Sequence, residues 1–214
     1  MNEKLLLVGG GGHCRSVLDS LSEMGRYAEI GIVDKAENAG KHVLGIAVIG
    51  CDDDLSDLYE KGFTHAFVTL GSTGNVETRV RIFKILENIG FEIPNIVDST
   101  AIVSKHAKLA SGIFIGKNAV VNAGASIGKG AIINTSVTVD HDCGIGEFAH
   151  IATGAVLCGR VQVGKHTHIG AGSVIKQQVR IGAGTIIGMG SVVLDDVTEN
   201  VVAYGNPCRE VRAR

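Results

Sequence analysis

The sequence predicts a fold in two parts: an α/β N-terminal part with a small parallel sheet of Rossmann-like type, followed by a parallel β-helix. Two observations support this prediction. Short apolar runs alternate with helix-like segments up to about residue 95, and from Ala101 onward the chain repeats with a period of six residues. We therefore expect one domain over residues 1–95 and a second over residues 96–214, the second ending in a short tail.

Composition and charge narrow the class of protein. The formal net charge is only −2, so the chain offers no broad positive field for nucleic acid. Apolar runs stay well below the roughly 18 residues that span a membrane, and the N-terminus lacks the features of a signal peptide. Five cysteines without disulfide or zinc spacing favour free thiols. We therefore expect a cytoplasmic protein that neither binds nucleic acid nor inserts into a membrane.

The first 95 residues show strands that alternate with helices. "KLLLVGG" is a short apolar run that ends in glycines, and "HCRSVLDSLSEMG" places Val17, Leu18, Leu21 and Met24 at helical spacing. Next come a second strand in "AEIGIVD", a second helix in "DDDLSDLYEKG", a third strand in "HAFVTL" and a third helix over 75–90. This alternation predicts a small parallel sheet.

From Ala101 onward the period of six is strict. Every sixth residue from Val103 to Val193 is Val, Ile or Leu, sixteen positions in all. One place later the residue is often glycine: Gly116, Gly128, Gly146, Gly164, Gly170, Gly182 and Gly188. An ordinary β-sandwich would instead show period-two alternation in strands of variable spacing. A fixed six-residue period with glycine corners predicts a hexapeptide β-helix.

The hexad resembles that of the left-handed β-helix of hexapeptide acyltransferases, in which three hexads form one triangular coil. The resemblance implies about five coils, with residues eighteen apart stacked on adjacent coils. His141 is then expected under Gly159, and His150 under His168. Asn134, Ala152, Gly170 and Gly188 fall in one column. This edge, poor in side chains, suits a pantetheine arm, although glycines that simply form corners are the alternative.

The segment "INTSVTVDHDCGIGEFAH" raises two possible chemistries. A zinc site needs three or four converging ligands, and no third ligand is evident beside the stacked His150 and His168. Cys143 falls in a slot for small residues, where packing explains it. An acid–base pair fits better, because His141 can take a proton near neutral pH and Asp142 can orient its ring. Both occupy a corner, from which His141 can project outward.

Four segments of the chain resemble the sialic-acid O-acetyltransferase and UDP-amino-sugar N-acetyltransferase family of NeuD/PglD type. They are "LLLVGGGGHCRSVLD", "GIVDK", "NTSVTVDHDCGIGEFAHIATGAVLCG" and "VVAYGNPCR". The resemblance implies that His141 is the general base, with Asp142 where N-acetylating relatives often have Glu. Asn134 belongs to the same catalytic segment. His150 would contact acetyl-CoA near the thioester, and the Gly159 N–H would stabilise the tetrahedral oxyanion.

The resemblance also implies the cofactor edge and the assembly. The residues expected to line the coenzyme A arm are Gly170, Ala171, Gly172, Gly188 and Met189. Acetyl-CoA would be the co-substrate, with no metal, and transfer would be direct because no cysteine stands at a nucleophile position. Relatives place the active site between two subunits of a trimer, so a homotrimer is implied.

The N-terminal glycines predict an acceptor site. "GGGGH" resembles a dinucleotide fingerprint that lacks its third glycine, but a helix that begins after glycines still binds phosphate. We expect Gly10, Gly11, Gly12 and His13 to bind the diphosphate or sugar, with a helix-capping role as the alternative for His13. Asp34 and Lys35, at the end of the second strand, would meet the nucleoside.

These observations favour transfer of an acetyl group from acetyl-CoA to the amino group of a UDP- or GDP-linked amino sugar in surface glycan biosynthesis. Three alternatives remain open from the residues alone. One is O-acetylation of a sialic acid, and another is a non-catalytic trimer that binds nucleotide sugars. The third, a small NAD-dependent oxidoreductase, is disfavoured by the half-size sheet and the missing glycine.

Overall fold

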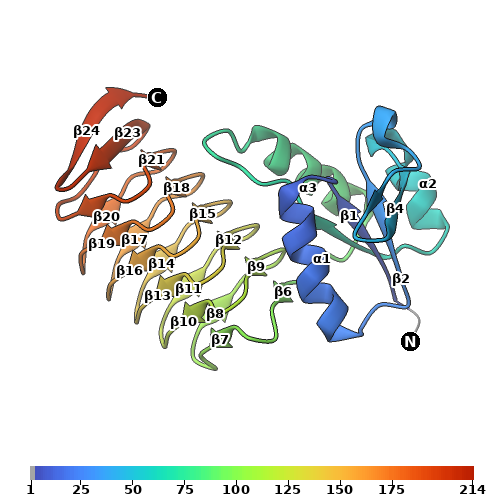
Figure 1. Cartoon of the computed structure of the whole chain (residues 1–214), viewed down its shortest axis with the longest axis horizontal. Helices are drawn as coiled ribbons and strands as arrows, with labels where there is room; N and C mark the ends of the chain where they lie inside the picture. Colours follow the sequence, from blue (N-terminus) through green and yellow to red (C-terminus); the bar gives the residue numbers. More distant parts are fainter. Residues whose placement is uncertain (1–2) are drawn as a thin grey trace. The chain divides into compact units, whose positions relative to one another are not determined.

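The computed structural model describes residues 3–214, which form two compact units (Figure 1). Unit 1 comprises the chain up to Gly71 together with Glu77–Ile96, and unit 2 comprises Ser72–Val76 and Val97–Arg214. Each unit has its own sheet system, and each is described by itself below.

Unit 1 is a five-stranded sheet in the order β3-β4-β2-β1-β5. Its strands are β1 (Lys4–Val8), β2 (Glu29–Val33), β3 (His42–Val43), β4 (Ile46–Gly50) and β5 (His65–Val68). All neighbouring pairs are parallel except the β3–β4 hairpin. The predicted parallel sheet is therefore confirmed. β3 and β4 in "HVLGIAVIG" were not predicted, because the strands are short and interrupted by Leu44-Gly45.

The helices of unit 1 follow the predicted positions closely. They are α1 (Gly12–Met24), the 3-10 turns η1 (Ala36–Asn38) and η2 (Asp52–Asp54), α2 (Leu55–Glu60) and α3 (Glu77–Ile89). α1 ends at Gly25, whose φ of 58° is the left-handed conformation that glycine adopts without strain. Val17, Leu18 and Leu21 are buried on α1, as helical spacing predicted, whereas Met24 is only partly buried. Cys14, which was not part of the prediction, also lies on the buried face.

Unit 2 is a stack of triangular coils made of two-residue strands, one in each hexad. The first face, called the β13 face, consists of β7 (Ile102–Val103), β10 (Val120–Val121), β13 (Thr138–Val139), β16 (Val156–Leu157), β19 (Val174–Ile175) and β22 (Val192–Val193). The β14 face consists of β8 (Lys108–Leu109), β11 (Ser126–Ile127), β14 (Gly144–Ile145), β17 (Gln162–Val163) and β20 (Arg180–Ile181). The β15 face consists of β6 (Ile96–Val97), β9 (Phe114–Ile115), β12 (Ile132–Ile133), β15 (His150–Ile151), β18 (His168–Ile169), β21 (Ile186–Ile187), β23 (Val201–Gly205) and β24 (Cys208–Ala213).

The hexad residues form the core of the coils. From Ile115 to Val193 every one of them is buried, while Val103 and Leu109 at the first coil are partly exposed. Residues eighteen apart pair in parallel register, as Ile133 does with Ile151, and Figure 1 shows the resulting successive rungs. No loop interrupts the repeat between β7 and β22, so the predicted β-helix is confirmed along its whole length. This regular stack fixes the height of every polar corner residue.

The last coil is closed by a hairpin. β23 pairs in parallel with β21 and in antiparallel with β24, so the open end of the β15 face is covered. The segment Ser72–Val76, which belongs to unit 2, is held to the C-terminus: the Arg214 guanidinium donates to the carbonyl groups of both Gly74 and Gly184. Across residues 3–214, no helix is long and apolar enough to cross a membrane.

Candidate functional site

His141 and Asp142 form the two-residue turn between β13 and β14, at the edge where the β13 and β14 faces meet. Both side chains point outward, with 55% and 53% of their surface exposed, and His141 Nδ1 lies 3.0 Å from Asp142 Oδ2. Asp142 has a φ of 58°, which turns its side chain back toward the neighbouring imidazole. The pair has the geometry of a base with an orienting carboxylate.

Small residues above and below leave room for this pair. Gly159 stacks on His141, and a Cβ added to Gly159 would overlap the imidazole Nε2. On the other side, a Cβ added to Gly124 would overlap the Asp142 carboxylate. The Arg160 amide donates to the His141 carbonyl at 2.8 Å, so the predicted stacking of these coils is present. The Nε2 atom of His141 therefore lies directly against the backbone of Gly159.

A second carboxylate anchors the turn from its backbone. Asp140 Oδ1 accepts the His141 N–H at 2.7 Å and the Asn122 Nδ2–H at 3.0 Å. The His141 amide, the Asn122 amide and, more weakly, the Gly159 N–H hold the pKa of Asp140 below its ordinary value. Asp140 thus remains ionised, and it links the base turn to the coil below and the coil above.

The pKa of Asp142 is also lowered, first by its hydrogen bond to His141 and then by the charges of His141 and Arg160. Arg160 Nε lies 3.8 Å from Asp142 Oδ2. Asp142 is therefore an anion at neutral pH. It accepts from His141 Nδ1, which leaves Nε2 as the imidazole nitrogen that can take a proton.

Asn134 and His150 lie at a different edge, where the β15 face meets the β13 face. His150 is 8% exposed, and its Nδ1 lies 2.7 Å from the Ser72 carbonyl. Since a carbonyl only accepts, Nδ1 carries the proton and Nε2 can accept from Asn134 Nδ2 at 3.5 Å. The His168 ring packs edge-on against His150, with centroids 4.9 Å apart, as the eighteen-residue stacking predicted.

The glycine column lies at this same Asn134 edge. A Cβ at Gly170 would meet the backbone of Gly188 and Met189 on the next coil, and a Cβ at Gly188 would meet Tyr204. Close packing of the coils therefore requires glycine at both positions. This agrees with the alternative explanation that these glycines simply form the corners of the coils. Ala171 is partly buried, whereas Gly172 and Met189 are exposed, and Met189 is 80% exposed.

One chain therefore brings together two separate groups of the predicted residues. The His141 edge contains His141, Asp142 and Gly159. The Asn134 edge contains Asn134, His150, Gly170, Ala171, Gly172, Gly188 and Met189. The two edges border the same β13 face but are distinct corners of the triangle. Within one chain the structure does not join the candidate base to the candidate coenzyme A edge.

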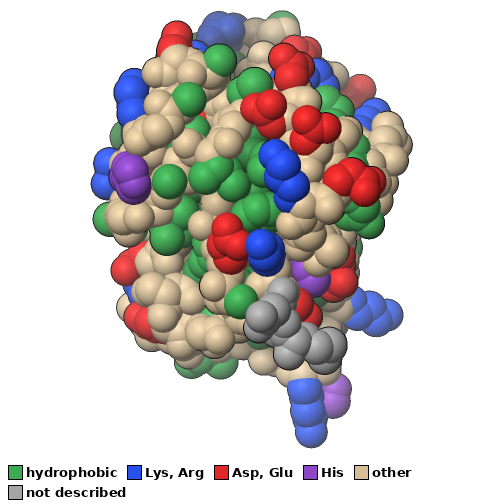
Figure 2. Space-filling view, turned by 90° about the vertical axis from the view of Figure 1, so that its right-hand side faces the viewer, with side chains coloured by type: hydrophobic (Ala, Val, Ile, Leu, Met, Phe, Trp, Pro, Cys, Tyr) green, Lys and Arg blue, Asp and Glu red, His purple; other side chains and the backbone are tan. Residues whose placement is uncertain are grey.

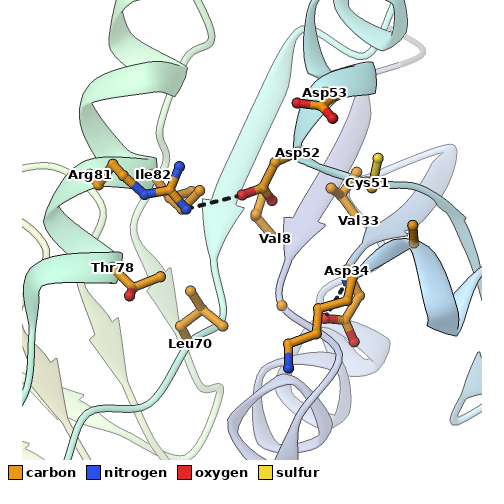
Figure 3. Close-up of a pocket in the computed structure, with 13 residues that line it drawn as sticks. Val8, Val33, Asp34, Cys51, Asp52, Asp53, Leu70, Thr78, Arg81 and Ile82 are labelled. Carbon is orange, nitrogen blue, oxygen red and sulfur yellow. Dashed lines mark hydrogen bonds and ion pairs between the residues drawn. The ribbon is translucent and has the colours of Figure 1, made fainter.

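Unit 1 holds a cavity of about 470 Å³ at the carboxyl ends of its parallel strands (Figure 3). Asp34 and Lys35 line it, as predicted for the end of the second strand, together with Gly9. Gly10 lies against the Asp34 carboxylate, because an added Cβ would be 2.6 Å from Oδ2. Gly11 caps α1, and Gly12 and His13 form its first turn, but these residues and Gly10 do not line the cavity.

Most of the residues that line the cavity were not predicted from the sequence. Cys51, Asp52 and Asp53 follow the unrecognised β4, and Thr78, Arg81 and Ile82 come from α3. Arg81 Nη2 lies 3.2 Å from Asp52 Oδ2. A signal was available, since "IAVIG" followed by acids repeats the pattern of "GIVD" at β2. Figure 2 shows acidic and basic side chains intermixed on one face of the molecule, without a continuous patch of one sign.

Among residues 3–214, no group of three or more His, Cys, Asp or Glu side chains is arranged to hold a metal ion. The described cysteines, all five of them, are free thiols. Burial raises the pKa of the Cys143 thiol, which lies next to the base turn, to about 11. Cys143 is therefore a packed thiol and has no nucleophilic thiolate at neutral pH.

Comparisons with protein-family models match both parts of the chain. Residues 4–86 match the PglD N-terminal domain. Residues 142–177 match the bacterial transferase hexapeptide repeat, and residues 112–141 and 160–195 match the hexapeptide repeat of succinyl-transferase. No curated protein sequence matches at a significant level.

Several solved structures match the chain over almost its full length. PerB from Caulobacter crescentus, in complex with CoA and GDP-perosamine, is 35% identical with a TM-score of 0.92, and the match covers 99% of both chains. The acetyltransferase domain of PglB from Neisseria gonorrhoeae, in complex with acetyl coenzyme A, is 34% identical with a TM-score of 0.92, covering 99% of this chain and 100% of that one. WeeI from Acinetobacter baumannii is 25% identical with a TM-score of 0.87, covering 98% and 100%.

Proposed function

This chain belongs to the NeuD/PglD-type family of hexapeptide acyltransferases, and on that premise we propose that it acetylates the amino group of a nucleotide-linked amino sugar, with acetyl-CoA as donor. The single observation that carries the proposal is the His141–Asp142 pair. It projects from the β-helix at the corner where Gly124 and Gly159 leave room for its side chains. The nucleotide sugar bound by PerB and the donor bound by PglB supply the substrate classes.

In the proposed mechanism His141 Nε2 takes the proton from the sugar amine as it attacks the thioester carbonyl carbon. Asp142, ionised and hydrogen-bonded to Nδ1, stabilises the imidazolium that forms. The Gly159 N–H, which interacts only weakly with Asp140, is the proposed donor for the tetrahedral oxyanion, next to the same imidazole. When the carbon–sulfur bond breaks, His141 returns the proton to the coenzyme A thiolate. Transfer is direct, since burial keeps the Cys143 thiol protonated.

The coenzyme A arm is proposed to follow the Asn134 edge, from His150 and Asn134 near the thioester along Gly170–Gly172 to Gly188 and Met189. This edge offers backbone with few side chains, and the exposed Met189 provides an apolar surface. His150 is buried against Ser72, so its ring contributes to this edge mainly through Asn134. The site is complete only when this edge meets the His141 edge of another copy.

The outward side chains of the β13 face support a homotrimer in which the two edges meet. They are nearly all β-branched and apolar: Ile102, Val120, Thr138, Val156, Val174 and Val192. Ile102 is 66% exposed and Val174 is 39% exposed in the single chain. Such a stripe favours burial against further copies. Three prisms that turn this face toward a common axis bring the His141 edge of each copy against the Asn134 edge of the next.

Unit 1 is proposed to hold the nucleotide sugar, with Asp34 and Lys35 at the nucleoside and Gly10–His13 near the diphosphate at the start of α1. The role of residues 1–95 in acceptor binding and of residues 96–214 in acetyl transfer is part of this proposal. A cytoplasmic location is also proposed, because five free thiols suit a reducing compartment.

The proposal is tested by release of the coenzyme A thiol from acetyl-CoA in the presence of UDP- and GDP-linked amino sugars. Turnover with an amino sugar but not with its hydroxyl counterpart supports N-acetylation. Turnover with sialic acid instead would identify sialic acid as the acceptor. Binding of a nucleotide sugar without any thiol release would contradict an enzymatic function. His141→Ala is the control for background hydrolysis of the thioester.

A further inference from the structure

The cavity of unit 1 has an apolar interior and a charged rim. Its walls include Val8, Val33, Leu70 and Ile82, and its rim includes Asp34, Lys35, Asp52, Asp53 and Arg81. A volume of about 470 Å³ lies within the range of small-molecule sites, roughly 300–1,000 Å³. Apolar walls with polar groups at the edge suit a nucleobase, whose faces are apolar and whose edge carries the hydrogen-bonding groups.

Asp34 indicates how a nucleotide would be oriented in the cavity. It follows β2, and in open parallel sheets an acid at this position binds the ribose hydroxyl groups. Its oxygens already accept the Lys35 N–H at 2.8 Å and the Asn38 Nδ2–H at 3.0 Å, which orients the carboxylate for further donors. With the ribose at Asp34 and the diphosphate toward α1, the base extends toward Asp52 and α3.

At this end of the cavity a donor and an acceptor lie side by side. Arg81 Nη2 and Asp52 Oδ2 are 3.2 Å apart, with 58% and 40% of their side-chain surface exposed. Figure 3 shows Arg81 reaching from α3 across the cavity toward Asp52, which follows β4. Neither side chain is buried, so both can move to meet a ligand edge. Such an exposed pair contributes little to the stability of the fold. Its position at the cavity therefore suggests a role in ligand binding instead.

We infer that the Arg81–Asp52 pair reads the base and selects a guanine nucleotide, an inference that rests on the proposed function of unit 1. Guanine presents the O6 acceptor next to the N1–H and N2–H donors, so Arg81 donates to O6 while Asp52 accepts from N1 and N2. Uracil presents a single N–H between two carbonyl groups, so a carboxylate that pairs with that N–H also faces a carbonyl oxygen. Arg81 can donate to a uracil carbonyl as it does to O6, so the discrimination lies in the second Asp52 oxygen, which meets the N2–H of guanine but a carbonyl oxygen of uracil.

The charge of the rim agrees with this assignment. Three carboxylates, Asp34, Asp52 and Asp53, face two cations, Lys35 and Arg81. An excess of acceptors favours the hydroxyl and amino donors of guanosine and disfavours phosphate oxygens. The diphosphate is thereby directed away from the rim, toward the start of α1.

Titration calorimetry of the full chain with GDP, IDP and UDP tests the inference. IDP differs from GDP only in the missing N2 amino group. We expect GDP to bind roughly 5- to 150-fold more tightly than UDP, the discrimination of one good bidentate contact, and more tightly than IDP. Asp52→Ala should abolish the preference for GDP over IDP and over UDP. The matched control is Glu29→Gln, which breaks the 2.7 Å Lys4–Glu29 ion pair at the opposite end of the strands and should leave the preference unchanged.

The outcomes separate this inference from the proposed function. Equal or tighter binding of UDP, or a GDP preference that survives Asp52→Ala, would overturn the guanine assignment. If thiol release then occurs with a UDP-linked amino sugar, the acetyltransferase function stands without it. Selective GDP binding without any acetyl transfer supports the guanine assignment and contradicts the acetyltransferase function. Absence of all nucleotide binding to a folded chain would contradict both.

Discussion

His141 Nδ1 and Asp142 Oδ2 lie 3.0 Å apart although the two residues are adjacent in the chain. Neighbouring side chains in extended backbone point to opposite sides, so this contact depends on the turn and on the positive φ of Asp142. Gly124 on the coil below leaves the space that the carboxylate occupies. In a flexible surface loop such a pair would be poorly positioned. Here the repeat fixes the direction of the imidazole and the coil on which it lies.

Removing the imidazole should abolish most of the activity. We expect His141→Ala to lower kcat by about 10²- to 10⁴-fold, the usual contribution of a positioned general base. Because the side chain is exposed, its loss should leave the melting temperature nearly unchanged. Steady-state thiol release and thermal unfolding measure the two effects. A loss of less than about tenfold would contradict the role of His141 as base.

A methyl group at Gly159 should damage the site and spare the fold. The added Cβ of Gly159→Ala meets only the flexible end of His141, so the imidazole is displaced and kcat falls. Gly164→Ala is the matched comparison, because its Cβ would meet the backbone of Ala183 on the next coil. We expect the melting temperature to drop clearly in Gly164→Ala and little in Gly159→Ala. Equal destabilisation by both would show that Gly159 is needed for packing alone.

Asp140 should act as a positioning residue. Asp140→Asn keeps an acceptor for the His141 N–H but removes a negative charge near the imidazole. Since a nearby anion stabilises the imidazolium, we expect the acidic limb of the kcat/KM profile to move to lower pH. Asn122→Ala removes only the support from the coil below and should lower kcat without moving that limb. An unchanged profile in Asp140→Asn would restrict Asp140 to holding the turn.

Mixed assemblies test whether the site lies between copies. His141→Ala inactivates one edge and Asn134→Ala the other, so each variant alone should have low activity. Random trimers of the two should regain about a quarter of the wild-type sites, because a site then combines an intact His141 edge with an intact Asn134 edge of the neighbour. Val156→Glu on the β13 face should dissociate the assembly and prevent recovery. Activity no greater than the sum of the two variants would place the site within one chain.

His168 should make stability depend on pH. Burial lowers its pKa below the ordinary value of 6.5, so the unfolded chain binds more protons than the folded one below about pH 6.5. The folded state is therefore destabilised as pH falls from 6.5 toward the lowered pKa. We expect His168→Gln to lose less melting temperature than the wild type between about pH 7.5 and 5.5, and the exposed His106→Gln to behave like the wild type.

The sequence predicts the six-residue repeat and its glycine corners, because an inward apolar residue recurs at every sixth position. Its resemblance to hexapeptide acyltransferases, with three hexads in each coil, adds the stacking of His141 on Gly159. The sequence also located α1, α3 and the strands that precede Asp34. The β3–β4 hairpin escaped it, since a two-residue strand and a bent five-residue run carry no periodic signal. Because the hairpin was not predicted, the position of Asp52 at the cavity and its pairing with Arg81 were not predicted either.

The contacts among the polar residues become evident only in the folded chain. The arithmetic of the repeat places Asn134 and His141 in successive hexads, but it does not give the direction of their side chains or the contacts that each one makes. The turn geometry separates them, because each two-residue strand is followed by a bend that starts a new face. Likewise, Arg81 and Asp52 are far apart in the chain and meet only because α3 and the end of β4 flank the same cavity. Long-range contacts of this kind depend on packing between elements, which local residue patterns do not encode.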